Sequence, residues 1–215
     1  MAQSYFVIGT DTDVGKTYIV SALVRHFVAK GKQTVGMKPI ASGCKPDQQG
    51  ELINDDVLAL TNASNVKAAL DLVNPYRFLP AIAPHLAAQQ SGIVMHLATI
   101  TQAYQQLTAL AEVVIVEGAG GFFVPINETE TLADLALRLN IPVILVVGMR
   151  LGCINHALLT VEALNTRGLK LAGWIANQIE PDMPMFEENL TSLQQRISAP
   201  CLSVVRWQGD LHLEF

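Results

Sequence analysis

Charged and aromatic residues are both scarce in this sequence. Charged residues make up 15% and aromatic residues 6% of the 215-residue chain, whereas hydrophobic residues make up 50%. The net charge is −5 and no run of basic residues occurs, which argues against nucleic acid as the main partner. A chain this rich in aliphatic residues can bury a large core, so disorder along its whole length is excluded.

Long apolar runs and paired cysteines are also missing. No uninterrupted apolar stretch approaches the roughly 20 residues of a membrane-spanning helix. The first residues lack the basic segment and apolar stretch of a signal peptide. Cys44, Cys153 and Cys201 are odd in number and lack metal-ligand spacing, which fits a reducing compartment. We therefore expect a cytoplasmic protein that binds neither membrane nor nucleic acid.

Strand and helix patterns alternate along almost the whole chain. Short apolar runs predict buried strands at residues 5–9, 34–37, 113–116, 142–147, 171–176 and 201–205. Apolar residues at helical spacing predict helices at residues 20–28, 55–60, 97–111, 132–139, 154–164 and 186–197. Residues 41–51 are predicted to form a surface loop, and residues 74–76 and 80–84 irregular connections. This order predicts an α/β fold, a mostly parallel sheet with helices on both faces, in a single domain over residues 1–215.

A glycine-rich segment, GTDTDVGKT at residues 9–17, follows the first predicted strand and opens the first predicted helix. Backbone N–H groups in such a turn, and the helix dipole, attract phosphate. Lys16 would reach the β- and γ-phosphates, and the Thr17 hydroxyl would bind Mg²⁺. Five residues separate the two glycines, one more than usual, and Thr10 takes the place of the first glycine. The segment predicts a nucleoside triphosphate site in a P-loop NTPase-like fold.

Three other charged positions fall where predicted strands or helices begin or end. Glu117 follows the strand at 113–116 and precedes glycines, so it would meet the metal held at the phosphate loop while the glycines approach the γ-phosphate. Lys38 follows the strand at 34–37 and could stabilise a developing anion there. The acidic pair Asp55-Asp56 opens a helix, and spacing alone does not separate capping from metal binding.

Taken together, several segments resemble the dethiobiotin synthetase family in order across roughly residues 4–200. The matching segments are GTDTDVGKT (9–17), KPIASG (38–43), NPY (74–76), VEGAGG (116–121), PVILVVG (142–148), LGCINHA (151–157) and AGWIAN (172–177). The segments at 38–43 and 151–156 are typical of this family, whereas many NTPases share the phosphate loop.

This resemblance implies an ATP- and Mg²⁺-dependent ligase of biotin biosynthesis, acting on 7,8-diaminononanoate and CO₂. One amine of the substrate would capture CO₂ as a carbamate, ATP would phosphorylate the carbamate, and the second amine would close the ureido ring. The family also implies a homodimer with the substrate near the subunit interface.

The resemblance assigns roles residue by residue. Lys16 and Lys38 would be catalytic, and the metal ligands would be Thr17, Asp56 and Glu117, with Asp56 favoured over Asp55 by the family pattern. The implied ATP-binding residues are Asp13, Val14, Gly15, Lys16, Thr17, Tyr18, Asp56, Glu117, Gly118, Ala119, Gly120 and Asn177. The implied substrate-binding residues are Thr12, Lys38, Ser42, Leu151, Gly152, Cys153, Ile154 and Asn155.

The match weakens toward the C-terminus. Val205-Arg206-Trp207 stands where relatives usually carry an Ile-Pro-Trp-like segment that closes over the base, and Asn189 stands where a tyrosine is expected. Two alternatives remain open. An amide-forming ATPase of the cobyrinate diamide synthase type usually adds a glutamine-hydrolysing domain, for which 215 residues leave no room. A partitioning ATPase generally carries an early lysine in its phosphate loop, where this chain has Thr10-Asp11-Thr12.

Overall fold

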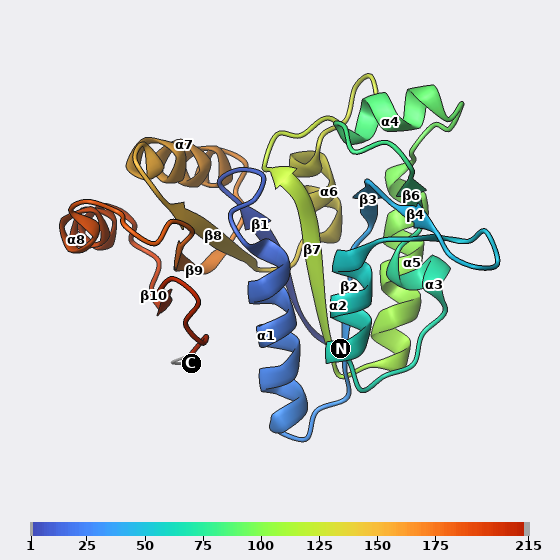
Figure 1. The fold of residues 1–215 in the computed structure, drawn as a ribbon, viewed down its shortest axis with the longest axis horizontal. Helices are drawn as coiled ribbons and strands as arrows, with labels where there is room; N and C mark the ends of the chain where they lie inside the picture. The colour runs from blue at the N-terminus through green and yellow to red at the C-terminus, as the bar shows by residue number, and fades with distance from the viewer. Residues whose placement is uncertain (1, 213–215) are drawn as a thin grey trace.

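A six-stranded parallel sheet forms the centre of the computed structural model, which describes residues 2–212. The strand order is β10-β9-β8-β1-β7-β2, and every neighbouring pair is parallel (Figure 1). The strands are β1 (Gln3–Gly9), β2 (Thr34–Met37), β7 (Val113–Gly121), β8 (Val143–Met149), β9 (Leu171–Gln178) and β10 (Cys201–Val205). The predicted parallel sheet is confirmed, and the predicted bounds of β2 and β10 agree with the structure.

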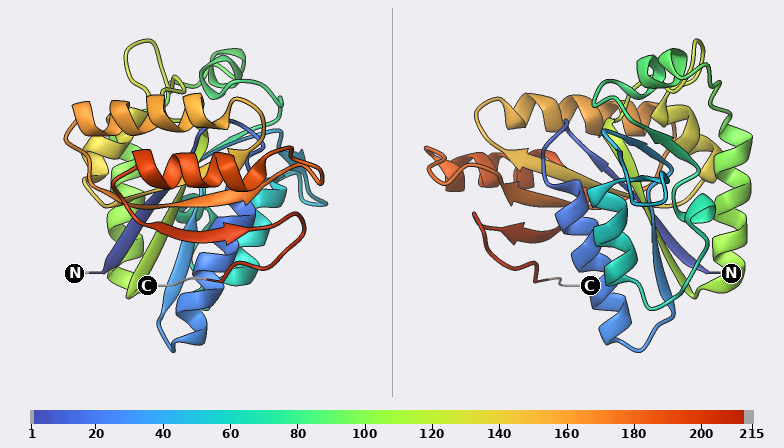
Figure 2. Two further views of the ribbon diagram at one scale, coloured as in Figure 1. Left: turned by 90° about the vertical axis from the view of Figure 1, so that its left-hand side faces the viewer. Right: turned by 45° about the vertical axis from the view of Figure 1, so that its right-hand side comes forward.

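Helices cover both faces of this sheet, as predicted. In Figure 1, α1 and α2 lie in front of the sheet and α5 and α6 behind it, and Figure 2 shows α7 beside α8. The helices are α1 (Lys16–Ala29), α2 (Asp55–Ala63), α5 (Leu97–Leu110), α6 (Leu132–Leu139), α7 (Cys153–Thr166) and α8 (Phe186–Arg196). Within the described residues, no helix has the length and apolar character that crossing a membrane requires.

Alternate residues of each strand enter different cores, which explains the continuous apolar runs. Val113 and Ile115 pack in the core beneath α1 and α2, whereas Val114 and Val116 pack in the core on the other face. Because side chains of a strand alternate between the faces, a strand covered on both sides must be apolar at every position. The high aliphatic content of the sequence follows from this architecture.

The segment predicted as a surface loop at residues 41–51 contains short strands instead. β3 (Ile40–Ser42) pairs in parallel with β6 (Tyr76–Phe78), and β4 (Lys45–Pro46) pairs antiparallel with β5 (Leu52–Ile53). The short helices α3 (Leu70–Val73) and α4 (Pro84–Gln90) flank β6. Elements of two to seven residues are too short to show a clear hydrophobic period, so the sequence does not distinguish them from irregular connections.

The strand β7 also continues beyond its predicted end at Val116. It runs through Glu117 to Gly121, where Gly9 of β1 pairs with Gly121. The prediction that Glu117 follows the strand is therefore wrong. Glu117 lies within the strand, opposite Val7 of β1, and its side chain is only 1% exposed.

Candidate active site

The phosphate loop lies between β1 and α1, and its backbone depends on Gly15. This residue has φ of +83°, and a Cβ atom built on it would lie 2.3 Å from Nδ2 of Asn177. Asn177, at the end of β9, donates that same amide nitrogen to the carbonyl of Val14 at 2.8 Å. Helix α1 thus begins directly after a position that only glycine can occupy without strain. The loop is also hydrogen-bonded to the end of a second strand, β9.

The unusual Thr10 fits this loop without strain. Its backbone N–H donates to the Val146 carbonyl of β8 at 3.0 Å, and its hydroxyl accepts from the Gly148 N–H at 3.4 Å. Among the described residues other than glycine, only Asp13, Asn140, Met185 and Gln208 have positive φ. Because Thr10 is not one of them, the position has no need of the glycine found in the usual pattern.

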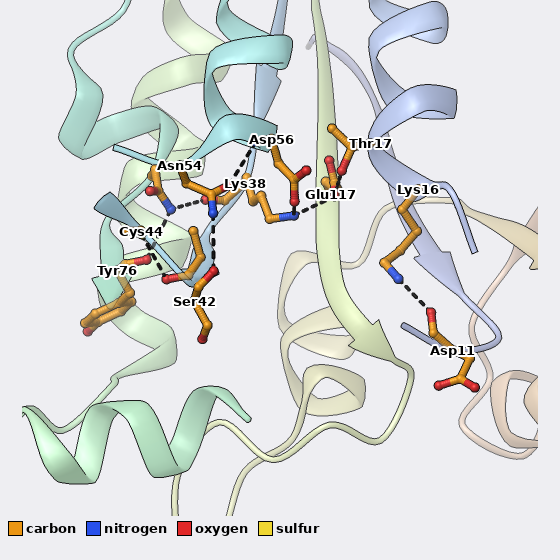
Figure 3. Close-up of polar contacts among 12 residues, drawn as sticks. Asp11, Lys16, Thr17, Lys38, Ser42, Cys44, Asn54, Asp56, Tyr76 and Glu117 are labelled. Carbon is orange, nitrogen blue, oxygen red and sulfur yellow. Dashed lines mark hydrogen bonds and ion pairs between the residues drawn. The ribbon is translucent and has the colours of Figure 1, made fainter. Parts of the chain in front are cut away.

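Lys16 is buried at the start of α1 with its ammonium turned toward the loop. Its Nζ donates to the backbone carbonyl of Asp11 at 2.8 Å (Figure 3). Burial lowers the pKa of Lys16 to about 8, although the negative charge of Glu117 acts in the opposite direction. Burial disfavours the charged form of Lys16, and the negative charge of a phosphate group bound in the loop would stabilise it.

Lys38, immediately after β2, lies between two carboxylates. Its Nζ contacts Asp56 Oδ2 and lies 2.7 Å from Glu117 Oε1, and the Thr17 hydroxyl donates to the same Glu117 oxygen at 2.7 Å (Figure 3). Burial alone would lower the pKa of Lys38, but Glu117 and Asp56 together raise it above its ordinary value. Burial acts to raise the pKa of Asp56, and the Lys38 ammonium more than offsets this and holds it below its ordinary value.

These side chains line one cleft of about 350 Å³. Its lining residues are Thr12, Asp13, Gly15, Lys16, Thr17, Lys38, Asp56, Glu117 and Gly120. The structure also separates the acidic pair that opens α2, because Asp55 is exposed and pairs with Lys45 at 3.5 Å. Asp56 therefore is the member of the pair that lines the cleft.

The oxygen atoms of the cleft suit a hard divalent cation. Thr17, Asp56 and Glu117 supply one hydroxyl and two carboxylates, and Glu117 Oε2 is buried with no hydrogen-bond partner among residues 2–212. In this range no group of three or more His, Cys, Asp or Glu residues could hold a metal. Mg²⁺ does not need such a group, since it keeps several waters and takes one or two carboxylates together with phosphate oxygens.

Two further cavities adjoin the cleft, each sharing a residue with it. One, of about 250 Å³, includes Asp13, Tyr18 and Asn177, with the C-terminal residues 205–209 as its wall. The other, of about 640 Å³, includes Thr12 and residues 121–125 and lies against α7. The sequence departure at residues 205–207 lies in the wall of the first cavity.

The remaining predicted site residues lie outside the cleft. Val14 and Gly118 are buried, and the Ser42 hydroxyl is buried with no partner in the part of the chain that the structure describes. Residues 151–155 open α7 but line neither the cleft nor the two adjoining cavities, and Leu151 is 97% exposed. Ala119 is half-buried within β7. The cleft of one chain therefore does not include the segment predicted to bind the substrate carboxylate.

Sequence reasoning missed three residues that hold the site together. Arg150 lies 2.5 Å from the Asp11 carboxylate, and so joins the end of β8 to the phosphate loop. Asn54 caps α2 by accepting from the Asp56 N–H at 3.0 Å, which an Asn before an acidic helix start could have indicated. Asn74 donates to the Lys38 carbonyl at 2.6 Å. Asn74 belongs to one of the matching segments, but no spacing rule indicates its partner.

Comparison with solved structures supports the same fold. The chain aligns with the septum site-determining protein MinD complexed with Mg-ADP from Pyrococcus horikoshii, with a TM-score of 0.58 and 15% identity over 96% of this chain and 82% of that one. The MinC:MinD complex of Aquifex aeolicus gives a TM-score of 0.60 with 13% identity over 95% and 81% of the two chains. At such identities these neighbours show a P-loop NTPase-like fold and no more.

Comparison with protein sequences is more specific. A family model described as an AAA domain matches residues 3–214. The ATP-dependent dethiobiotin synthetase BioD of Nitrosospira multiformis is 49% identical over 210 residues, which are 98% of this chain and 91% of that protein. The enzyme of the same name from Aromatoleum aromaticum is 50% identical over 203 residues, 94% and 90% of the two chains. The chain belongs to the family of ATP-dependent dethiobiotin synthetases.

Proposed function

We propose that this chain is a ligase that makes dethiobiotin from 7,8-diaminononanoate and CO₂, with hydrolysis of ATP to ADP and phosphate, in biotin biosynthesis. Family membership supports the overall reaction. The observation that carries the chemistry is the position of Lys38, whose ammonium lies 2.7 Å from Glu117 in the cleft that also contains the phosphate-loop residues Lys16 and Thr17.

The proposed reaction has three steps. One amine nitrogen of the substrate attacks CO₂ and loses a proton, which gives a carbamate. A carbamate oxygen then attacks the γ-phosphorus of ATP, and ADP leaves with the electrons of the broken P–O bond. The second amine attacks the carbonyl carbon of the resulting carbamic–phosphoric anhydride, loses a proton and expels phosphate as the ureido ring closes. Phosphorylation is needed because a carbamate oxygen is otherwise a poor leaving group.

The two lysines serve different partners in this proposal. Lys16, with the backbone N–H groups of residues 13–18, would hold the phosphates of ATP, and residues 118–120 would lie beside the γ-phosphate. Lys38 would stabilise the negative charge of the carbamate and of the phosphorylated intermediate. Its raised pKa keeps it cationic at neutral pH, as this electrostatic role requires. Asn177 and Tyr18 would lie near the adenine.

Mg²⁺ is the metal we propose for Thr17, Asp56 and Glu117. The hard oxygen donors of these side chains and the unpartnered Glu117 Oε2 fit this ion. When bound with ATP, Mg²⁺ would neutralise charge on the phosphate oxygens. The Thr17 hydroxyl and the Asp56 carboxylate would then fix the orientation of the triphosphate relative to Lys38.

The rest of the substrate site is proposed to need a second copy of the chain. Thr12 and Ser42 would contact the diamine or the carbamate. The start of α7, residues 151–155, would bind the substrate carboxylate through the Asn155 side chain, backbone N–H groups and the helix dipole. Because that segment lines neither the cleft nor the two adjoining cavities of its own chain and Leu151 is 97% exposed, we infer that it serves the cleft of the other subunit in a homodimer.

We further propose that residues 1–215 act as a single cytoplasmic domain. The decisive experiment measures ADP, phosphate and dethiobiotin from the purified protein while each reactant is omitted in turn. We expect release of ADP and phosphate only when diaminononanoate, bicarbonate and Mg²⁺ are all present. Phosphate release that ignores the diamine would overturn the ligase assignment and favour a nucleotide-switch ATPase.

A further inference from the structure

Lys38 follows the end of β2, at a point where no strand pairs with its backbone. β2 is the edge strand of the six-stranded sheet and ends at Met37, and Lys38 follows directly. The next residue, Pro39, has no N–H group to continue a ladder. A buried peptide must still satisfy its polar groups. The position of the Lys38 side chain therefore depends on what binds its backbone.

Residues 73 and 74 bind both polar groups of that backbone. The Lys38 N–H donates to the Val73 carbonyl at 2.9 Å, and Nδ2 of Asn74 donates to the Lys38 carbonyl at 2.6 Å. The same Nδ2 donates to the Tyr76 carbonyl at 3.1 Å. Asn74 is 0% exposed, so water does not compete for these bonds.

The backbone pairing between these two segments continues after Lys38 and Asn74. The Tyr76 N–H donates to the Pro39 carbonyl at 3.1 Å, and β3 then pairs with β6 from Ile40 opposite Tyr76 to Ser42 opposite Phe78. The segment at 73–78 thus supplies the partners that the chain lacks after the end of β2. Lys38 and Ser42, both proposed to contact substrate or carbamate, are held by one continuous segment.

Only the donor half of the Asn74 amide is used. Its Oδ1 is buried with no hydrogen-bond partner among the residues that the structure describes. A buried acceptor without a partner destabilises a fold, so an apolar residue would suit this position better if packing were its only role. The arrangement indicates that the donated hydrogen bonds are the reason for an amide at this position.

We propose that Asn74 is a positioning residue for Lys38, acting through the Lys38 carbonyl. Asn54 has the corresponding relation to Asp56, since its side chain accepts from the Asp56 N–H at 3.0 Å and donates to the Ser42 carbonyl at 3.2 Å (Figure 3). The buried side chains of Asn74 and Asn54 thus bind the backbone of the cleft's cation, Lys38, and of one of its carboxylates, Asp56. This assignment rests on the proposed role of Lys38 in dethiobiotin synthesis.

The test is Asn74→Ala, assayed for dethiobiotin formation, ATP binding and thermal unfolding. We expect kcat to fall about tenfold or more while KM for ATP stays within about twofold, because small displacements of a reacting group reduce turnover and the phosphate loop is untouched. Arg77→Met is a milder second variant, since it leaves the Asn74 side chain in place and removes only the hydrogen bond that Arg77 donates to the Asn74 carbonyl at 2.8 Å. It should lower kcat in the same direction by a smaller factor.

Asn65→Ala is the matched control. Asn65 binds the other end of β2 in the same manner, accepting from the Thr34 N–H at 2.7 Å and donating to the Lys32 carbonyl at 2.9 Å. Equal losses of kcat in Asn65→Ala and Asn74→Ala would overturn the assignment. So would a loss of kcat in Asn74→Ala that is fully explained by a lower thermal stability. If Asn74→Ala does not fold, an unchanged kcat in Arg77→Met overturns it. Failure of the proposed function would appear differently, as a wild-type protein that makes no dethiobiotin.

Discussion

Lys38 Nζ and Glu117 Oε1, which belong to residues 79 positions apart in the chain, lie 2.7 Å from each other in a buried contact. The same carboxylate oxygen accepts the Thr17 hydroxyl, so one atom connects the end of β2, the middle of β7 and the first turn of α1. A buried charge that loses its partner is strongly destabilising. Substitutions here must therefore be assayed for stability as well as for activity.

Replacing Lys38 should separate catalysis from nucleotide binding. We expect Lys38→Met to reduce dethiobiotin formation by about 100-fold or more, because a buried cation that faces developing negative charge contributes strongly to the transition state. ATP affinity should change by less than about threefold, since the phosphate loop and Lys16 remain. Initial rates together with calorimetric ATP titration would measure both quantities.

Lys45→Met is the control for this substitution. The Lys45 side chain is 80% exposed and contacts Asp55 outside the cleft, so its loss should leave turnover unchanged. Turnover in Lys38→Met equal to that in Lys45→Met would refute the proposed role of Lys38. Thermal unfolding of both variants would show whether a loss of turnover reflects a loss of folded protein.

Replacing Glu117 should change the dependence on Mg²⁺. Glu117→Gln keeps the shape of the side chain but removes the charge that would bind the metal, so the Mg²⁺ concentration for half-maximal activity should rise about tenfold or more. Glu112→Gln is the matched control, because Glu112 precedes the same strand and pairs with Lys32 at the surface. An unchanged Mg²⁺ dependence in Glu117→Gln would exclude this residue as a ligand.

The lowered pKa of Lys16 makes nucleotide binding depend on pH. With a pKa of about 8, caused mainly by burial, this lysine loses its proton progressively as the pH of the nucleotide-free protein rises from 7 to 9. Phosphates favour the ammonium form, so binding should take up a proton near pH 8.5 and the affinity for ATP should fall as pH rises. Lys38 would not contribute to this proton uptake, because its raised pKa keeps it protonated in the nucleotide-free protein.

Calorimetric titrations in two buffers with different ionisation enthalpies would measure this proton uptake. Lys16→Arg, whose guanidinium stays charged at every accessible pH, should bind ATP without it. Equal proton uptake in the variant and the wild type would assign the titration to another group.

The composition of the cleft could be predicted from sequence because it follows from sheet geometry. Lys16 and Thr17 belong to a recognisable loop, and the carboxyl ends of parallel strands meet at one edge, which brings Lys38 and Glu117 close to that loop. The choice of Asp56 over Asp55 rested on the family resemblance. In the structure Asp56 contacts Lys38, whereas Asp55 contacts Lys45.

The features that sequence could not give are those decided by contacts between distant segments. β7 extends past Val116 because β1 runs beside it up to Gly9. A glycine-rich segment with one acidic residue shows no strand pattern by itself. Asn74 binds a carbonyl 36 positions away, and no local rule connects an amide in an Asn-Pro sequence with the end of a particular strand. Both features depend on tertiary proximity.

Mixing two inactive variants would test whether α7 of one subunit serves the cleft of the other. Lys38→Met removes a cleft residue, and Asn155→Ala removes a side chain from the start of α7, where residues 151–155 line neither the cleft nor the two adjoining cavities of their own chain. If the segment acts across a symmetric interface, a mixed dimer contains one intact site. Random mixing should then restore about a quarter of the wild-type activity.

The control for this experiment mixes Lys38→Met with Glu117→Gln. Both residues line the cleft of a single chain, so neither site of a mixed dimer is intact and no activity should return. Two affinity tags purified in sequence would establish that mixed dimers have formed. If the purified Lys38→Met and Asn155→Ala mixed dimer is inactive, residues 151–155 act on their own chain. An absence of mixed species at all would contradict the homodimer itself.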